Sequence, residues 1–379
     1  RSALAREDSP LVAGNDVRLL VDGPQTHNAM FAAMRAADDH INLQSYIISD
    51  DEVGRELSRL LRDKRSQGVR VNVLYDAMGG RDTPAEFFES LRQAGIAVCE
   101  FNPVNPLRAR IWRINNRNHR KLLIVDGRVA FTGGINISGV YSAGSFGGEA
   151  RTPECGWRDT HVRFEGPVVR EPQTLFVSDW RSQPHCPALQ EGAFFPAAAA
   201  RGTRLVRLVA STPDAGSETY AALGNARHRA WLTYGYFVPD ETTLAALQDA
   251  ARRGVDVRLV LPGFSDFWAP LEAGRSHYEQ LLEYGVRIYE RTDALLHAKT
   301  AVIDGVWSTV GSTNLDWRSF VHNYEADLVV LDEAFALQLE KLFELDVAHS
   351  REITLDAWRQ RGAWQRMKEW LARQWRYWL

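Results

Sequence analysis

Two stretches of the chain contain the same chemically reactive residues in the same order and with the same spacing. HRKLLIVDGRVAFTGGIN begins at His119, and HAKTAVIDGVWSTVGSTN begins at His297. Each has the pattern His-x-Lys-x-x-x-x-Asp followed by Gly-x-x-Asn. A lone His-x-Lys on a strand is more often structural than functional, but two matched copies inside a longer repeat indicate one shared site.

The segments that follow the two histidines are rich in β-branched and apolar residues, which is typical of strands. Side chains at positions i and i+2 lie on the same face of a strand. We therefore expect His119 to lie beside Lys121, and His297 beside Lys299. If the two copies pack about a pseudo-twofold axis, both pairs surround one cavity.

The Asp-Gly dipeptides at Asp126 and Asp304 predict turns. These aspartates are candidate catalytic residues, or they hold the turn or pair with a nearby cation. A second strand then returns toward the His-Lys pair, where small residues would let a phosphate oxygen approach backbone N–H groups. The predicted phosphate-binding residues are Gly133, Gly134, Asn136, Ser312 and Asn314.

Two imidazoles, two ammonium groups and two amides, without a cluster of metal-binding carboxylates, suit a phosphoryl centre with no metal or cofactor. One imidazole would attack phosphorus to form a phosphohistidine, while the other protonates the leaving alcohol and then deprotonates the incoming one. The lysines and asparagines would donate to the non-bridging oxygens.

Each histidine also needs an acceptor that fixes its tautomer. The strands WRDTHVRFEG and NYEADLVVLD follow the two motifs and align Asp159 with Glu325. We expect these two carboxylates to orient the histidines; the alternative is that both are solvated residues on strands.

The repeat extends well beyond the motifs. SYIISDDEVGRELSRLLRDKRSQGVRVNVLYDAMGG and GYFVPDETTLAALQDAARRGVDVRLVLPGFSD both predict a strand, a helix and a strand. Alternating strands and helices predict an α/β fold with two similar α/β/α sandwich lobes, each a mixed sheet flanked by helices, related by a pseudo-twofold axis. The expected lobes are residues 1–190 and 200–350, with a boundary near 183–203 and a C-terminal amphipathic helix over 351–379.

Lys and Arg (45) nearly balance Asp and Glu (48), so the chain lacks the basic field expected of a nucleic-acid-binding protein. The three cysteines, Cys99, Cys155 and Cys186, have no zinc-type spacing, and we expect them to be inert, without a disulfide framework. No apolar run is long enough for a transmembrane helix.

Two segments are candidate lipid contacts. The stretch FNPVNPLRARIWRINNRN is an insertion in the first copy, and it is either a solvated loop or a lip that faces phosphate or lipid headgroups through Arg108, Arg110, Trp112 and Arg113. The tail places Trp364, Met367, Leu371, Trp375 and Trp378 on one helical stripe, with Arg366 and Arg373 opposite. This stripe fits a membrane surface, or packing on the protein itself or on a second subunit.

The paired motifs resemble the defining pattern of the phospholipase D superfamily. INLQSYIISDDEVGRELSRLL, WRDTHVRFEGPVV, YFVPD and GSTNLDWRSFVHNYEADLVVLD are similar to its bacterial cardiolipin synthase branch. The resemblance implies transfer of a phosphatidyl group from phosphatidylglycerol to a second phosphatidylglycerol, with His119 as nucleophile and His297 as general acid and base, or the reverse. A hydrolytic phospholipase D or a nuclease is the alternative, and a non-catalytic lipid-binding protein is a remote one.

The sequence departs from the family in two ways. Gly134 stands where many members have a serine, as Ser312 does in the second copy. The N-terminal membrane spans of some cardiolipin synthases are not seen, so the chain resembles the shorter type. We expect a peripheral protein that binds anionic phospholipid at the membrane, on the cytoplasmic face of the bacterial inner membrane, in an oligomeric state that stays open.

Overall fold

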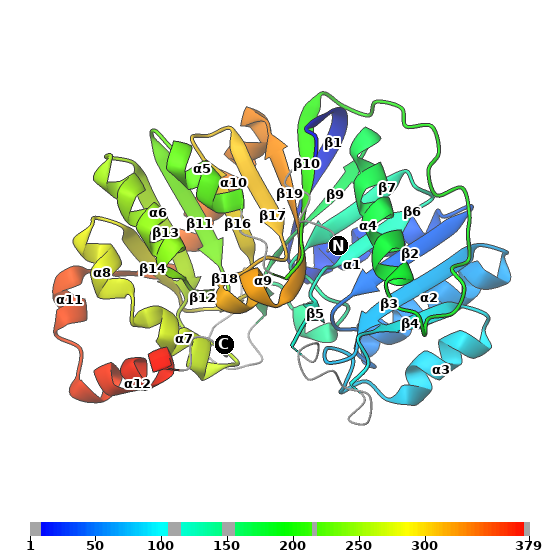
Figure 1. The fold of residues 1–379 in the computed structure, drawn as a ribbon, viewed down its shortest axis with the longest axis horizontal. Helices are drawn as coiled ribbons and strands as arrows, with labels where there is room; N and C mark the ends of the chain where they lie inside the picture. The colour runs from blue at the N-terminus through cyan, green and yellow to red at the C-terminus, as the bar shows by residue number, and fades with distance from the viewer. Residues whose placement is uncertain (1–8, 105–114, 146–155, 214–217, 375–379) are drawn as a thin grey trace.

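The computed structural model describes residues 9–104, 115–145, 156–213 and 218–374. One continuous mixed sheet runs through both halves of the molecule (Figure 1). Its first half contains, in order from the centre, β1 (Val12–Val21), β9 (Thr160–Glu165), β7 (Val129–Gly133), β6 (Leu122–Val125), β2 (His40–Ser45), β3 (Arg70–Asp76) and β4 (Ala97–Phe101).

The second half repeats this order from the centre outward. It contains β10 (Arg204–Ser211), β19 (Asn323–Leu331), β17 (Trp307–Gly311), β16 (Lys299–Ile303), β11 (Arg229–Tyr234), β13 (Asp256–Pro262) and β14 (Arg287–Arg291), with β20 (Ser350–Ile353) added at the edge. The antiparallel pair β1 and β10 joins the halves. The predicted α/β fold with two similar lobes is confirmed, and the two sheets are joined edge to edge.

Helices cover both faces of each sheet. In the first lobe α1 (Asp22–Arg35), α2 (Glu52–Ser66) and α3 (Ala85–Gln93) enclose one apolar core, and in the second α5 (Glu218–Asn225), α6 (Glu241–Arg252) and α8 (Tyr278–Glu283) enclose another. On the other face, α4 (Arg170–Arg181) and α10 (Glu333–Ala348) contribute to a core shared by both lobes. This shared core fixes the lobes relative to each other.

The repeated sequence produces repeated local structure. Asp51 caps α2 by accepting a hydrogen bond from the N–H of Gly54 (3.1 Å), and Asp240 caps α6 by accepting one from Thr243 (2.8 Å). The apolar positions predicted to face the core, such as Leu57 on α2, are buried. The strand–helix–strand unit is therefore encoded locally in each half.

The C-terminal region differs from the expected single helix over 351–379. It contains β20, which pairs antiparallel with β14, then α11 (Leu355–Arg359) and α12 (Ala363–Gln374). The second sheet therefore extends to Ile353, because the free edge of β14 is satisfied by a strand from the tail. Within the part of the chain that the structure describes, no helix is both long and apolar enough to span a membrane.

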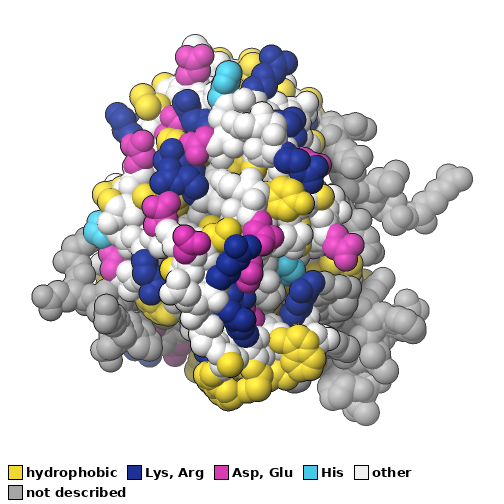
Figure 2. All heavy atoms as spheres, turned by 90° about the vertical axis from the view of Figure 1, so that its left-hand side faces the viewer, with side chains coloured by type: hydrophobic (Ala, Val, Ile, Leu, Met, Phe, Trp, Pro, Cys, Tyr) yellow, Lys and Arg dark blue, Asp and Glu magenta, His cyan; other side chains and the backbone are white. Residues whose placement is uncertain are grey.

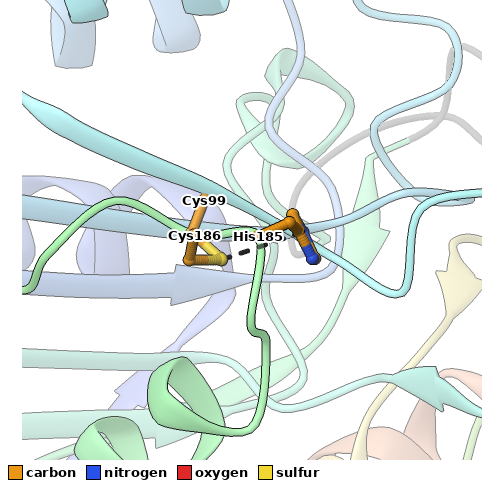
Figure 3. A group of neighbouring side chains, drawn as sticks. All are labelled: Cys99, His185 and Cys186. Atoms are coloured by element: carbon orange, nitrogen blue, oxygen red, sulfur yellow. Dashed lines mark hydrogen bonds between the residues drawn. A yellow bond between two sulfur atoms is a disulfide. The ribbon is translucent and has the colours of Figure 1, made fainter.

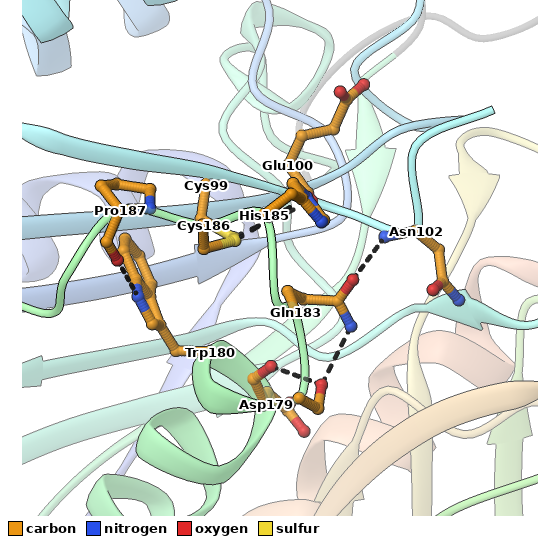
Figure 4. The surroundings of a disulfide bond; sticks show 10 residues. Cys99, Glu100, Asn102, Asp179, Trp180, Gln183, His185, Cys186 and Pro187 are labelled. Carbon is orange, nitrogen blue, oxygen red and sulfur yellow. Dashed lines mark hydrogen bonds between the residues drawn. A yellow bond between two sulfur atoms is a disulfide. The ribbon is translucent and has the colours of Figure 1, made fainter. Parts of the chain in front are cut away.

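The prediction that the cysteines form no disulfide is wrong for one pair. Cys99 on β4 and Cys186, in the linker between the lobes, are joined by a disulfide with their Cα atoms 5.1 Å apart (Figure 3). The neighbouring His185 bonds through Nε2 to the carbonyl of Glu100 (2.7 Å), and Trp180 donates to the carbonyl of Pro187 (3.0 Å; Figure 4). The linker thus folds back along β4, a contact that cysteine spacing does not reveal.

Candidate active site

Two short parallel strand pairs connect the lobes at the site. β5 (Arg117–Asn118) of the first lobe pairs with the start of β19, and β15 (Leu295–Leu296) of the second lobe pairs with β8 (Trp157–Arg158). In each pair one strand leads directly into a motif histidine. The other leads into the carboxylate that the sequence aligns between the copies.

His119 therefore lies beside the carboxylate of the opposite lobe. Its Nδ1 is 3.0 Å from Oε2 of Glu325, and its backbone N–H donates to the carbonyl of Tyr324 (3.0 Å). Burial lowers the pKa of His119, while Glu325 opposes this effect. Burial works to raise the pKa of Glu325, but the nearby His119 and Lys121 outweigh it, so that this pKa is lowered. A neutral ring that donates Nδ1–H to an anionic Glu325 fits these shifts.

His297 has the symmetry-related environment. Its Nδ1 is 2.7 Å from Oδ2 of Asp159, and its backbone N–H donates to the carbonyl of Arg158 (2.8 Å). Burial and the ammonium of Lys299 lower the pKa of His297 well below its ordinary value. Burial raises the pKa of Asp159, although Lys299 opposes this effect. Each carboxylate thus lies within hydrogen-bond distance of the histidine of the other lobe.

The two motif lysines lie directly behind the histidines. Nζ of Lys121 donates to the carbonyl of His119 (2.6 Å), and Nζ of Lys299 donates to that of His297. Burial lowers the pKa of Lys121 to about 7 and that of Lys299 to about 8. Lys299 further lowers the pKa of Lys121, and both lysines and His119 lower the pKa of His297. All four groups therefore share one electrostatic environment.

Both histidines line one cleft of about 840 Å³ between the lobes. Asn136 and Asn314 line it as predicted, and the carboxamide oxygen of Asn314 has no hydrogen-bond partner among the described residues. Asn136 is held through its Nδ2, which donates to the hydroxyl of Tyr141 (3.2 Å). The cleft therefore presents amides beside two imidazoles.

The surroundings of Asp126 and Asp304 favour the alternative in which these aspartates hold a turn. They lie outside the cleft lining, at the far ends of β6 and β16. Asp126 accepts the backbone N–H groups of residues 38–40, and Asp304 accepts those of residues 227–229, at 2.7–3.0 Å. They hold the loops that enter the adjacent strands β2 and β11.

Three of the predicted phosphate-binding residues lie behind the cleft instead. Ser312 donates its hydroxyl to Oε2 of Glu325 (2.6 Å), so it fixes a carboxylate. The N–H of Gly134 already bonds to the carbonyl of Thr160 (3.0 Å), and a Cβ at Gly134 would lie 2.1 Å from Oδ1 of Asp159. A Cβ at Gly133 would collide with His161. At both positions the space that a side chain would need is occupied by protein atoms.

The candidate lipid contacts are only partly described. Arg108, Arg110, Trp112, Arg113, Trp375 and Trp378 lie outside the described residues. Trp364 lies on α12 and is exposed.

Several residues of the cleft were not predicted as site residues. Tyr46 packs edge-on against His119 (ring centroids 5.1 Å apart), and Tyr236 packs edge-on against His297 (6.0 Å). The sequence could have indicated these two tyrosines, because they occupy equivalent positions of the repeat. The repeat does not point to three further cleft residues, because they have no identical counterpart in the other copy or reach the cleft only through the tertiary fold. These are Trp157, whose ring is 5.4 Å from that of His297, Arg318 and Asn323.

Comparisons with known proteins identify the family to which the chain belongs. A family model described as the PLD-like domain of cardiolipin synthase matches residues 30–142 and 220–347. The chain is 38% identical over 357 residues to cardiolipin synthase A of Pseudomonas fluorescens, covering 93% of this chain and 72% of that protein. It is 35% identical over 378 residues to a cardiolipin synthase of Listeria monocytogenes, covering 98% and 77%.

Among solved structures, phosphatidylserine synthase of Haemophilus influenzae has a TM-score of 0.74 at 14% identity, over 97% of this chain and 95% of that one. Polyphosphate kinase of Porphyromonas gingivalis has a TM-score of 0.59 at 14% identity, over 90% of this chain and 49% of that one. At such low identity these two structures show the shared fold alone.

Proposed function

Because the chain belongs to the family of cardiolipin synthases with phospholipase D-like domains, we propose that it is a phosphatidyltransferase that joins two phosphatidylglycerol molecules. The products are cardiolipin and glycerol. The observation that supports this most directly is the cleft, in which two imidazoles each have Nδ1 beside a carboxylate of the opposite lobe. This arrangement leaves Nε2 of each ring for chemistry at phosphorus.

In the first step Nε2 of His119 attacks the phosphorus of phosphatidylglycerol. The P–O bond to glycerol breaks, and His297 donates its Nε2 proton to the departing oxygen. The anionic phosphate favours the protonated form of His297 that this step needs. The enzyme then carries a phosphatidyl group on His119, and His297 is neutral.

In the second step a hydroxyl of another phosphatidylglycerol attacks the phosphohistidine. His297 accepts the proton of that hydroxyl, a new P–O bond forms, and the P–N bond to His119 breaks. Both histidines return to their starting states. Lys121, Lys299 and the two cleft amides stabilise the negative charge that develops on the non-bridging oxygens.

Lipid substrates require contact with a membrane. We propose that the protein acts as a peripheral membrane protein on anionic phospholipid of the bacterial inner membrane. The exposed aromatic side chain of Trp364 on α12 supports such contact.

The proposal is tested by incubating the purified protein with phosphatidylglycerol vesicles, without added metal, and identifying the products by mass. Cardiolipin plus glycerol is expected. His119→Ala and His297→Ala should each reduce turnover by about 1,000-fold or more, since both steps need both groups. With radiolabelled lipid, an acid-labile phosphoenzyme should form slowly in His297→Ala and persist, because its resolution is slowed as well, and none should form in His119→Ala.

The matched control is His185→Ala, which removes an exposed histidine that is not part of the cleft lining and should leave turnover unchanged. Phosphatidic acid plus glycerol as the only products would identify a hydrolase instead. Undiminished cardiolipin synthesis by either motif variant would overturn the mechanism.

A further inference from the structure

One rim of the catalytic cleft is formed by the first turn of α7 (Trp268–Arg275) and the residues before it. Phe267 and Pro270 line the cleft. Phe267 is exposed, and the adjacent Trp268 has 59% of its surface exposed. Large aromatic side chains rarely remain this exposed without a partner. Exposed aromatic side chains, Phe267 and Trp268, therefore lie at the mouth of the cleft.

Helix α12 packs against α7 through its polar side. Glu369 and Ala372 are buried, and Glu369 forms an ion pair with Arg361 (3.1 Å). Gln365 donates to Glu272 of α7, and Ala372 packs against a small apolar cluster on the second lobe. A surface helix normally buries its apolar side, so the orientation of α12 is reversed.

The apolar side of α12 consequently faces solvent. Trp364 is 68% exposed and Trp370 is 61% exposed, and Met367 and Leu371 are exposed beside them. Figure 2 shows hydrophobic side chains gathered at the lower end of the face that contains α12 in Figure 1. Three residues of the stripe predicted from the sequence, Trp364, Met367 and Leu371, are thus exposed on described turns of α12, with Trp370 beside them. Trp375 and Trp378 lie outside the described residues.

Positive charge lies along one edge of this apolar side. Arg366 and Arg373 are exposed and three to four positions away from the outward-facing Trp370. Tryptophan rings favour the boundary between headgroups and acyl chains, and arginine favours anionic headgroups. The combination is complementary to an anionic bilayer.

We propose that Phe267, Trp268, Trp364, Met367, Trp370 and Leu371 form a docking surface that binds an anionic phospholipid bilayer and holds the cleft mouth at headgroup level. The inference rests on the proposed function, in which the substrate headgroup enters the cleft while its acyl chains stay in the membrane. A bilayer is favoured over a second copy of the chain because the docking surface continues into the cleft lining at Phe267. A protein partner on it would cover the entrance.

The test compares the wild type with the double variant Trp370→Glu/Leu371→Glu and with Leu337→Glu, which changes an exposed leucine on α10 away from the docking surface. Each protein is sedimented with vesicles of phosphatidylglycerol and phosphatidylcholine, and with phosphatidylcholine alone. The double variant should bind the anionic vesicles about tenfold or more weakly, and Leu337→Glu should bind like the wild type. Wild-type binding should weaken as salt is added.

Turnover is measured on vesicles and on short-chain phosphatidylglycerol below its micelle concentration. The ratio of vesicle to short-chain turnover should fall about tenfold in the double variant only. Equal vesicle binding by the double variant and the wild type would overturn the inference. So would a wild-type dimer, seen by light scattering, that the double variant abolishes while vesicle binding is unchanged. If the wild type turns over neither substrate, the proposed function fails, and the sedimentation comparison still decides the docking surface.

Discussion

At the scale of single residues, the two halves of the site hold their histidines with different carboxylates. Glu325 reaches His119 and is held by the hydroxyl of Ser312, whereas the shorter Asp159 reaches His297 and occupies the space beside Gly134. A serine at position 134 would collide with Asp159. The glycine that departs from the family pattern is therefore explained by the carboxylate that it accommodates.

The lysines make the site sensitive to pH. The pKa of Lys121 is lowered to about 7 and that of Lys299 to about 8, mainly by burial, so both ammonium groups lose their charge as the pH rises through this range. We expect kcat/KM, which reports the free enzyme, to fall between about pH 7 and pH 9. The alkaline limb of kcat should lie at higher pH, because bound phosphate favours the charged lysines.

This prediction is checked with pH profiles of both parameters on short-chain phosphatidylglycerol. Circular dichroism at each pH is the control for unfolding. A kcat/KM that stays level up to pH 9 would show that neither lysine charge contributes to binding or catalysis.

At the scale of elements, the spacing that the two motifs share places different residues at opposite ends of one strand. The histidine and lysine at one end belong to the site, and the aspartate at the other end accepts three backbone N–H groups. Asp126 and Asp304 both have positive φ values, 53° and 52°, which asparagine tolerates better than alanine does. The aspartate stabilises the hairpin that positions the chemistry.

Replacing Asp304 should therefore affect stability more than catalysis. Asp304→Ala is expected to lower the free energy of unfolding by about 1–2 kcal/mol, and Asp304→Asn by less. The pKa of Asp304 is lowered because the three backbone hydrogen bonds outweigh its burial. Its contribution is thus present at neutral pH and lost as the pH falls below about 4, where the variant and the wild type should converge.

Urea unfolding at several pH values measures these differences, and turnover of the folded variants should stay near that of the wild type. A loss of turnover comparable to that of the histidine variants, with unchanged stability, would return Asp304 to the catalytic residues.

At the scale of the whole molecule, neither lobe contains a complete site. Each supplies a histidine whose orienting carboxylate belongs to the other, and the antiparallel pairing of β1 with β10 and the shared core keep the two in register. The linker that connects the lobes is fastened to β4 by the disulfide between Cys99 and Cys186. The bond therefore stabilises the packing of the linker on β4, and neither cysteine lines the cleft.

Cys186→Ser should lower the free energy of unfolding by about 2–4 kcal/mol, because the bond closes a long loop in the unfolded chain. Adding a reductant to the wild type should have the same effect, and the stability of Cys186→Ser, which has no bond left to reduce, should not respond to the reductant. Turnover of the folded variant should be unchanged. Equal stability of Cys186→Ser and the wild type under oxidising conditions would contradict this role.

The sequence by itself determined the repeated α/β units and the candidate residues for the proposed chemistry. His119, Lys121, His297 and Lys299 were identifiable because strand periodicity and matched spacing are local properties. The pairing of Asp159 with Glu325 as equivalent residues followed from the same repeat.

Only the tertiary structure decided which carboxylate serves which histidine, because that depends on strand pairs between the lobes. It also decided the disulfide, the backbone N–H groups that Asp126 and Asp304 accept, and the outward direction of Trp370. Each of these depends on contacts between residues far apart in the chain, and spacing within a segment carries no information about them.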